Sequence, residues 1–170
     1  MMKKIIVLFL VLYGFYSCEN HIGDEEFEKI NWKARQATIP NADSLEIGTS
    51  YLSVYSQIYS YSQHKTYNLT AMVSLRNTSV TDSIYLYNVD YYDTHGTLLK
   101  PYIKNPVFLA PMETLDIVIN EADITGGTGS NFIFDWKTPK NCSEPIFEGV
   151  MTSTAGQQGL SFITQAKRIR

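Results

Sequence analysis

An alternation of apolar and polar residues with a period of two constrains this chain most. Between residues 68 and 76, Leu69, Ala71, Val73 and Leu75 alternate with Asn68, Thr70, Met72, Ser74 and Arg76. Successive side chains of an extended chain point to opposite faces, so one face of this segment is apolar. The segment is therefore predicted to be a strand with one buried face.

The same character recurs along most of the chain. Segments rich in β-branched or aromatic residues lie at 51–61, 83–92, 114–119, 131–137, 146–152 and 160–166. Gly, Pro, Asn or Asp separates most of them, and no long helical pattern interrupts them. This organisation predicts an antiparallel sandwich or barrel, and we expect an all-β, immunoglobulin-like β-sandwich of about seven to eight strands.

Two connections and one predicted strand carry further local signals. Gly96 can adopt the positive φ of a tight turn after Tyr92. The prolines between 101 and 111 favour an edge strand or a crossing between sheets, because proline donates no ladder hydrogen bond. The apolar phase shifts within 83–92, which predicts a β-bulge near Asn88.

The first residues have the order of a secretory signal peptide. Lys3 and Lys4 precede an unbroken apolar run over 5–12, and 13–17 lead to Cys18. About 12 helical residues would reach only ~18 Å, well below the ~30 Å hydrocarbon core of a bilayer. A cleaved signal is therefore expected rather than a transmembrane helix.

A small residue directly before a cysteine, Ser17-Cys18, resembles the lipobox of bacterial lipoproteins, which implies cleavage before Cys18 and acylation of its thiol. The alternative is an ordinary signal peptide with an incidental cysteine. Loss of residues 1–17, with two lysines and no acid, lowers the formal net charge from −3 to −5. An acidic protein is not attracted to anionic headgroups, so acyl chains would hold it to the membrane.

The predicted organisation has three parts: a lipoprotein signal peptide (1–17), a polar tether (18–47) and one β-sandwich domain (48–170). A short helix over 24–36 is an alternative for part of the tether.

Cys142, without a partner once Cys18 is acylated, is expected to be buried beside a strand. The acidic balance and the absence of a Lys/Arg run argue against a nucleic-acid partner.

A glycine-rich segment is the most unusual local feature. It gives a candidate ligand loop made of Asp123, Gly126, Gly127, Gly129, Ser130 and Asn131. Exposed N–H groups of such a turn can form an anion nest. However, the phosphate-loop motifs that need a following lysine or helix are missing, and the alternative is a simple strand connection capped by Asp123.

Charged residues offer few further candidates. Arg76 and Asp90 are predicted to form a structural ion pair, because a carboxylate between aromatic neighbours in a strand needs a partner. Neither a catalytic residue nor a metal site or cofactor is assigned, since the three histidines are scattered and the acids lack the spacing of a calcium loop. A hydrolase of envelope polymers that uses Asp90, Asp93 and Asp123 remains the alternative function.

The tyrosines are concentrated early in the domain, with all ten beyond the signal between 51 and 102. Tyr55, Tyr59, Tyr85 and Tyr87 are the candidates for an aromatic platform that binds a sugar or an extended peptide. The alternative is cross-strand pairing that stabilises the sheet.

The chain contains a set of short motifs in a fixed order: Ser-Leu-Arg-Asn at 74–77, Val-Asp-Tyr-Tyr-Asp at 89–93 with Gly96, Leu-Ala-Pro at 109–111, Asp123 with the glycine loop to Phe132, Val-Met at 150–151, and Gly-Leu-Ser-Phe at 159–162. This arrangement resembles a bacterial envelope family, domain of unknown function 3124. The likeness runs from about Val54 to Ile169 and implies an exported or lipid-anchored protein without a known activity. Residues 77–119 are also similar to immunoglobulin-like modules of the desiccation-protein type, a likeness of fold only.

These observations predict a lipid-anchored protein of the bacterial cell envelope, in the outer membrane of a Gram-negative cell on its periplasmic or surface side. Its expected role is that of a binding or envelope-structural module. The expected partners are the membrane, through acyl chains on Cys18, and an envelope protein or glycan.

Overall fold

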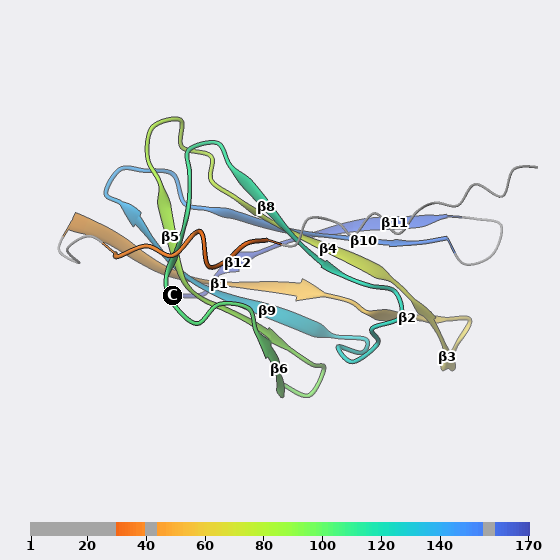
Figure 1. The fold of residues 1–170 in the computed structure, drawn as a ribbon. Coiled ribbons are helices and arrows are strands. Elements are labelled where there is room, and N and C mark those ends of the chain that lie inside the picture. Colours follow the sequence, from red (N-terminus) through yellow and green to blue (C-terminus); the bar gives the residue numbers. More distant parts are fainter. Residues whose placement is uncertain (1–29, 40–43, 155–158) are drawn as a thin grey trace, which may run out of the picture.

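The structure is a computed structural model that describes residues 30–39, 44–154 and 159–170 (Figure 1). The predicted signal peptide and Cys18 lie outside these residues. Within the described ranges, no helix combines the length and the apolar character that crossing a membrane requires. The fold is built almost entirely from antiparallel strands.

The first sheet contains the strands β1 (Leu45–Val54), β5 (Ile84–Tyr92), β6 (Leu98–Pro101), β7 (Val107–Leu109), β9 (Ser130–Pro139) and β12 (Lys167–Arg168). Its order is β12-β1-β9-β5-β6, and β7 also pairs with β5. The second sheet contains β4 (Thr70–Arg76), β8 (Thr114–Ile119), β10 (Ile146–Ser153) and β11 (Leu160–Gln165), in the order β11-β10-β4-β8. Most neighbouring strands are distant in sequence, so the sheets form through long-range pairing.

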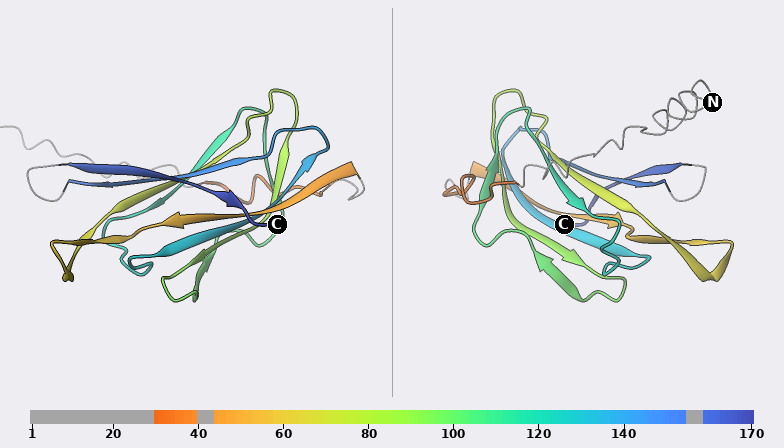
Figure 2. Two further views of the ribbon diagram at one scale, coloured as in Figure 1. Left: turned by 180° about the vertical axis from the view of Figure 1, so that it is seen from behind. Right: turned by 45° about the vertical axis from the view of Figure 1, so that its right-hand side comes forward.

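Two further strands, β2 (Gln57–Ser60) and β3 (Ser62–Asn68), form a separate two-stranded sheet, here called the ribbon. The ribbon continues from the end of β1 and projects beyond the two layers of the sandwich (Figures 1 and 2).

Alternating side chains of both sheets make the core. In β9, Phe132, Phe134 and Trp136 point inward and are fully buried. Phe134 stacks on Phe147 of β10 with a centroid distance of 4.0 Å, which joins the two sheets. The indole N–H of Trp136 donates to the Ser50 hydroxyl at 2.9 Å, so its polar atom is satisfied within the core.

The predicted all-β sandwich is confirmed, with twelve strands in the described residues rather than seven to eight. The additional strands are short or polar and lack a clear alternation. The segment 51–61 was expected to be one strand, but β1 ends at Val54 and β2 begins at Gln57. The buried side chain of Ser56 lies at this break and ties it to the sandwich.

Local chemistry was predicted well elsewhere. A register shift between Leu86 and Asn88 confirms the bulge in β5. Gly96 has the expected positive φ of 79°. β6 ends at Pro101, and the chain then runs along the first sheet as β7 and crosses to β8 of the second, as its prolines indicated. Cys142 is half-buried at the border of the core, whereas full burial was expected.

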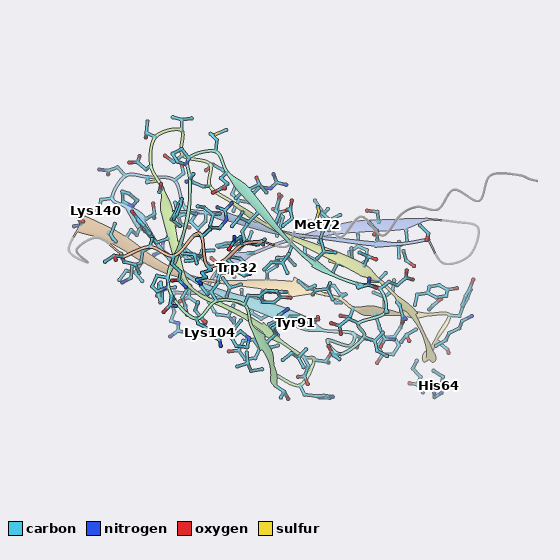
Figure 3. All side chains as sticks on the ribbon, viewed as in Figure 1. Trp32, His64, Met72, Tyr91, Lys104 and Lys140 are labelled. Carbon is cyan, nitrogen blue, oxygen red and sulfur yellow. The ribbon has the colours of Figure 1, made fainter. Side chains whose placement is uncertain are left out.

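Residues 30–39, here called the strap, belong to the predicted tether but lie against the sandwich. Gln36 forms a β-bridge with Val107, and the Arg35 guanidinium contacts the Glu113 carboxylate at 2.7 Å. Trp32 packs against the core from the strap (Figure 3). Residues 32–35 form turns and Gln36 forms the bridge, so this part of 24–36 is not the alternative helix, and residues 24–29 lie outside the described residues.

Candidate functional site

The ribbon presents the most exposed aromatic side chains of the described structure. Tyr61 is 91% exposed and Tyr59 is 62% exposed, although tyrosine in a sheet usually covers neighbouring strands. Tyr67 approaches Tyr61 edge-on, with 6.5 Å between the ring centroids and 80° between the ring planes. We call these three tyrosines, together with Lys65, the aromatic tip.

Lys65 contacts two of the three rings of the aromatic tip. Its ammonium lies 5.3 Å from the Tyr61 ring centroid and 5.6 Å from that of Tyr67, within the range of a cation–π contact. A hydrogen bond with Ser60 lowers the pKa of the Tyr67 hydroxyl, and a hydrogen bond with Tyr67 raises the pKa of Tyr61. These contacts link Tyr61, Lys65 and Tyr67, whereas Tyr59 pairs with Thr66 of β3.

The backbone at the tip is strained. Tyr61 has a φ of 61°, a left-handed conformation that favours glycine or asparagine. It forms the apex between the paired residues Ser60 and Ser62. Below the apex, the Gln57 amide donates to Thr66 and Asn68 and closes the base of the ribbon.

The charge of the ribbon differs from that of the whole chain. Residues 57–68 contain one lysine, one histidine and no carboxylate, whereas the chain has a net charge of −3. His64 lies on the exposed ribbon, remote from Tyr91 inside the sandwich (Figure 3). The ribbon is therefore a basic, aromatic projection on an acidic protein.

The structure does not bring the four tyrosines of the predicted platform together. Tyr55 lies between β1 and β2 and packs on Phe162 at 5.9 Å, and Tyr59 lies on the ribbon. Tyr85 and Tyr87 lie on the outer face of the first sheet, where Lys137 pairs with Tyr85 and stands over the Tyr87 ring. Lys137 is near the Leu45 end of β1, about 25 to 30 Å of extended chain from the ribbon end.

The candidate ligand loop is closed by the chain itself. The N–H of Gly127 donates to Ile124, and the N–H of Gly129 donates to the Thr94 hydroxyl. The carbonyl of Gly127 accepts from Ser56 and Gln57. Two of the N–H groups expected for an anion nest are therefore already in use.

The remaining loop residues also have structural contacts. Gly126 is buried, and a Cβ there would lie 1.9 Å from the Tyr91 hydroxyl. That hydroxyl contacts Ser56 and Ser130 at 3.0 and 3.4 Å, and Asn131 belongs to β9. The Asp123 carboxylate accepts from the N–H and hydroxyl of Thr125, which is the turn cap expected for it. The loop thus makes structural contacts at one end of the sandwich.

Arg76 and Asp90 do not pair. Arg76 extends from the outer face of β4 to Glu148 of β10 at 3.0 Å. Asp90 lies on β5 of the other sheet and accepts from Asn88 and Tyr92. The predicted pair is corrected because the two strands belong to different layers and both side chains face outward.

The acids of the hydrolase alternative serve separate local roles. Asp93 accepts from the N–H groups of His95 and Thr97 at 2.8 Å each, which lowers the pKa of its carboxyl group. Asp90 and Asp123 have the partners described above. The three carboxylates are thus engaged with their own turns and strands.

A cleft of about 710 Å³ lies between the strap and β8. Its lining combines apolar and charged side chains: Ile30, Ala34, Phe108, Leu115 and Val118 with Arg35, Glu113 and Asp116. None of the residues predicted as site residues lines it. Within the described ranges, no three His, Cys, Asp or Glu side chains are grouped as metal ligands.

The sequence analysis missed the apex at Tyr61. The run Tyr-Ser-Tyr-Ser at 59–62 lacks Gly, Pro, Asn and Asp, and its serines are only weak turn formers, so 51–61 was interpreted as one strand. Tyr67 and Lys65 were not identified either, because their contact with Tyr61 depends on the hairpin.

Comparisons with known proteins place the chain in one family. No curated protein matches it. The crystal structure of Thermotoga maritima 1070 is similar with a TM-score of 0.44 and 8% sequence identity, over 71% of this chain and 92% of that chain. The family described as "Protein of unknown function (DUF3124)" matches residues 47–169, which confirms the resemblance seen in the sequence motifs. Because this match spans well over half of the chain, the protein belongs to the DUF3124 family.

Proposed function

We propose that the protein is a lipid-anchored binding module of the bacterial cell envelope. Acyl chains on Cys18 hold it to the membrane, and the aromatic tip recognises a partner without covalent chemistry. The anchor is supported by the short apolar run over 5–12 that precedes Ser17-Cys18. The acidic remainder of the chain gives no electrostatic attraction to anionic lipid, so acyl chains would supply the attachment.

One observation carries the recognition surface: a tyrosine that is 91% exposed occupies a left-handed backbone position. Glycine or asparagine would relieve the strain of about 1 kcal/mol, and a polar side chain would avoid exposing an aromatic ring. Tyr61 is therefore unfavourable for folding on two counts. Strained, exposed residues of this kind are characteristic of surfaces that act in binding.

The anchor is tested by Cys18→Ala. The variant should lose acyl labelling and leave the membrane fraction when the signal is removed, whereas the parent stays membrane-bound and labelled. A parent chain without acyl label would contradict the lipid anchor. Cys142→Ala is the matched control, since that thiol has no role in anchoring and should leave the labelling unchanged.

The recognition surface is tested by a photo-crosslinking amino acid in intact cells. We expect substitution at Tyr61 to give defined adducts, with substitution at Val80 as the control. Val80 is 75% exposed and lies in the β4–β5 connection, at the other end of the sandwich. Equal yields at the two positions would show that the aromatic tip is not a recognition surface.

A further inference from the structure

We infer that the aromatic tip inserts into the headgroup region of the bilayer that holds the anchor. This assignment of a lipid surface as the partner rests on the proposed function. Its basis is the combination of side chains, charge and shape that the ribbon presents.

The exposed side chains match the membrane–water interface. Tyrosine combines an apolar ring with a hydroxyl group, and it is enriched where one end of a side chain meets hydrocarbon and the other meets water. Tyr59 and Tyr61 are the two most exposed of the tip, and Ser60 and Ser62 flank the apex. This mixture of rings and neutral polar groups suits the headgroup region better than the hydrocarbon core.

The distribution of charge also favours the ribbon as the part of the molecule that contacts the bilayer. Lys65 is the only residue of 57–68 with a full charge at neutral pH, so the ribbon can approach anionic headgroups without repulsion. Removal of residues 1–17, which include Lys3 and Lys4, gives the rest of the chain a net charge of −5. The chain as a whole is therefore repelled by the same anionic surface. The ribbon is thus the projection that can approach an anionic bilayer without electrostatic repulsion.

Shape and attachment favour a bilayer over a folded protein. The ribbon has two strands and no second layer, and it projects from the sandwich (Figure 2). A stable protein interface buries about 800 Å² and 20–30 residues on each partner, more than the tip of one hairpin offers. A weak contact with the bilayer is sufficient, because an anchored chain meets its own membrane at high effective concentration.

The test uses the full, acylated chain in vesicles of phosphatidylcholine and phosphatidylglycerol. Tyr61→Trp and Val80→Trp each add one tryptophan to the native Trp32 and Trp136. Brominated acyl chains quench only tryptophan near the hydrocarbon boundary. We expect the added fluorescence of Tyr61→Trp to fall at least twofold more in brominated vesicles than that of Val80→Trp.

Three outcomes separate this inference from the proposed function. Equal quenching of the two variants on chains that float with the vesicles overturns the insertion and leaves the anchor intact. Crosslinks from position 61 to a protein or glycan instead of lipid overturn the inference and retain the recognition surface. Failure of the parent chain to float with the vesicles contradicts the anchor itself.

Lys65→Gln provides a second measurement. It removes the charge but keeps a long polar side chain, so the quenching of Tyr61→Trp should become weaker in vesicles with anionic lipid and stay unchanged in those of phosphatidylcholine alone. An identical effect in both vesicle types would contradict the electrostatic part of the inference.

Discussion

At the scale of single residues, the fold depends on positions where a side chain is excluded. Gly48 of β1 lies opposite Trp136 of β9, and the indole ring covers it. A Cβ at position 48 would lie 2.2 Å from the Trp136 ring. Because Trp136 is fully buried and its N–H is bound to Ser50, the ring has little freedom to move.

We expect Gly48→Ala to lower the free energy of unfolding by about 1–3 kcal/mol, the usual cost of overfilling a core. Urea unfolding followed by tryptophan fluorescence measures this change. Gly159→Ala is the control, because the nearest atom to its added Cβ is 4.0 Å away. Equal effects of the two substitutions would show that the contact with Trp136 does not matter.

At the scale of elements, the strap is held at the edge of the sandwich by a charged contact. The Glu113 carboxylate binds Arg35 on the strap and accepts from the Ala110 N–H at 2.8 Å. The hydrogen bond from Arg35 is the main reason why the pKa of Glu113 is lowered. Since the folded state favours the ionised carboxylate, this contact stabilises the protein above the pKa of the unfolded carboxyl and is lost as pH falls through the lower, folded pKa.

Glu113→Gln should therefore destabilise the protein at pH 7 by about 1 kcal/mol or less, because the pair is partly solvated. The difference from the parent should shrink as the pH falls below about 4.3, the ordinary glutamate pKa. Urea unfolding at a series of pH values measures both effects. Glu121→Gln, an acid just after β8 without an ion pair in the described residues, should show neither. A difference that stays constant with pH would contradict the role of the ionised pair.

At the scale of the whole molecule, the ribbon is an addition to a complete sandwich. The backbone hydrogen bond from Leu69 to Ser56 joins the two ends of the ribbon at 2.9 Å, so the sandwich is closed beneath it. The strand β12 pairs with β1 and forms one edge of the first sheet. The ribbon therefore lies outside the two sheets that form the core.

Replacement of residues 59–66 by Asn-Gly, which links the paired residues Ile58 and Tyr67, should preserve cooperative unfolding. We expect a change in unfolding free energy within about 1 kcal/mol, because the removed side chains are outside the core. Calorimetry and tryptophan fluorescence should give one common transition. Loss of that transition would show that the ribbon is part of the folding unit.

The sequence by itself determined the class of fold and the faces of its strands. The alternation in 68–76 predicted the buried row of β4, and the phase shift in 83–92 predicted the bulge of β5. Both are local signals, because the side-chain direction of a strand has a period of two residues. The turn at Gly96 was likewise predicted from the glycine alone.

Only the tertiary structure decided which residues meet. Arg76 contacts Glu148, 72 positions away, because β4 pairs with β10. Tyr61, Lys65 and Tyr67 lie together because the chain reverses at an apex that has no Gly, Pro, Asn or Asp. Strand pairing is set by the burial of both sheets together, and no local pattern encodes the partner of a given strand. The candidate site therefore emerged from the pairing, whereas the strands on which it stands were already evident in the alternation.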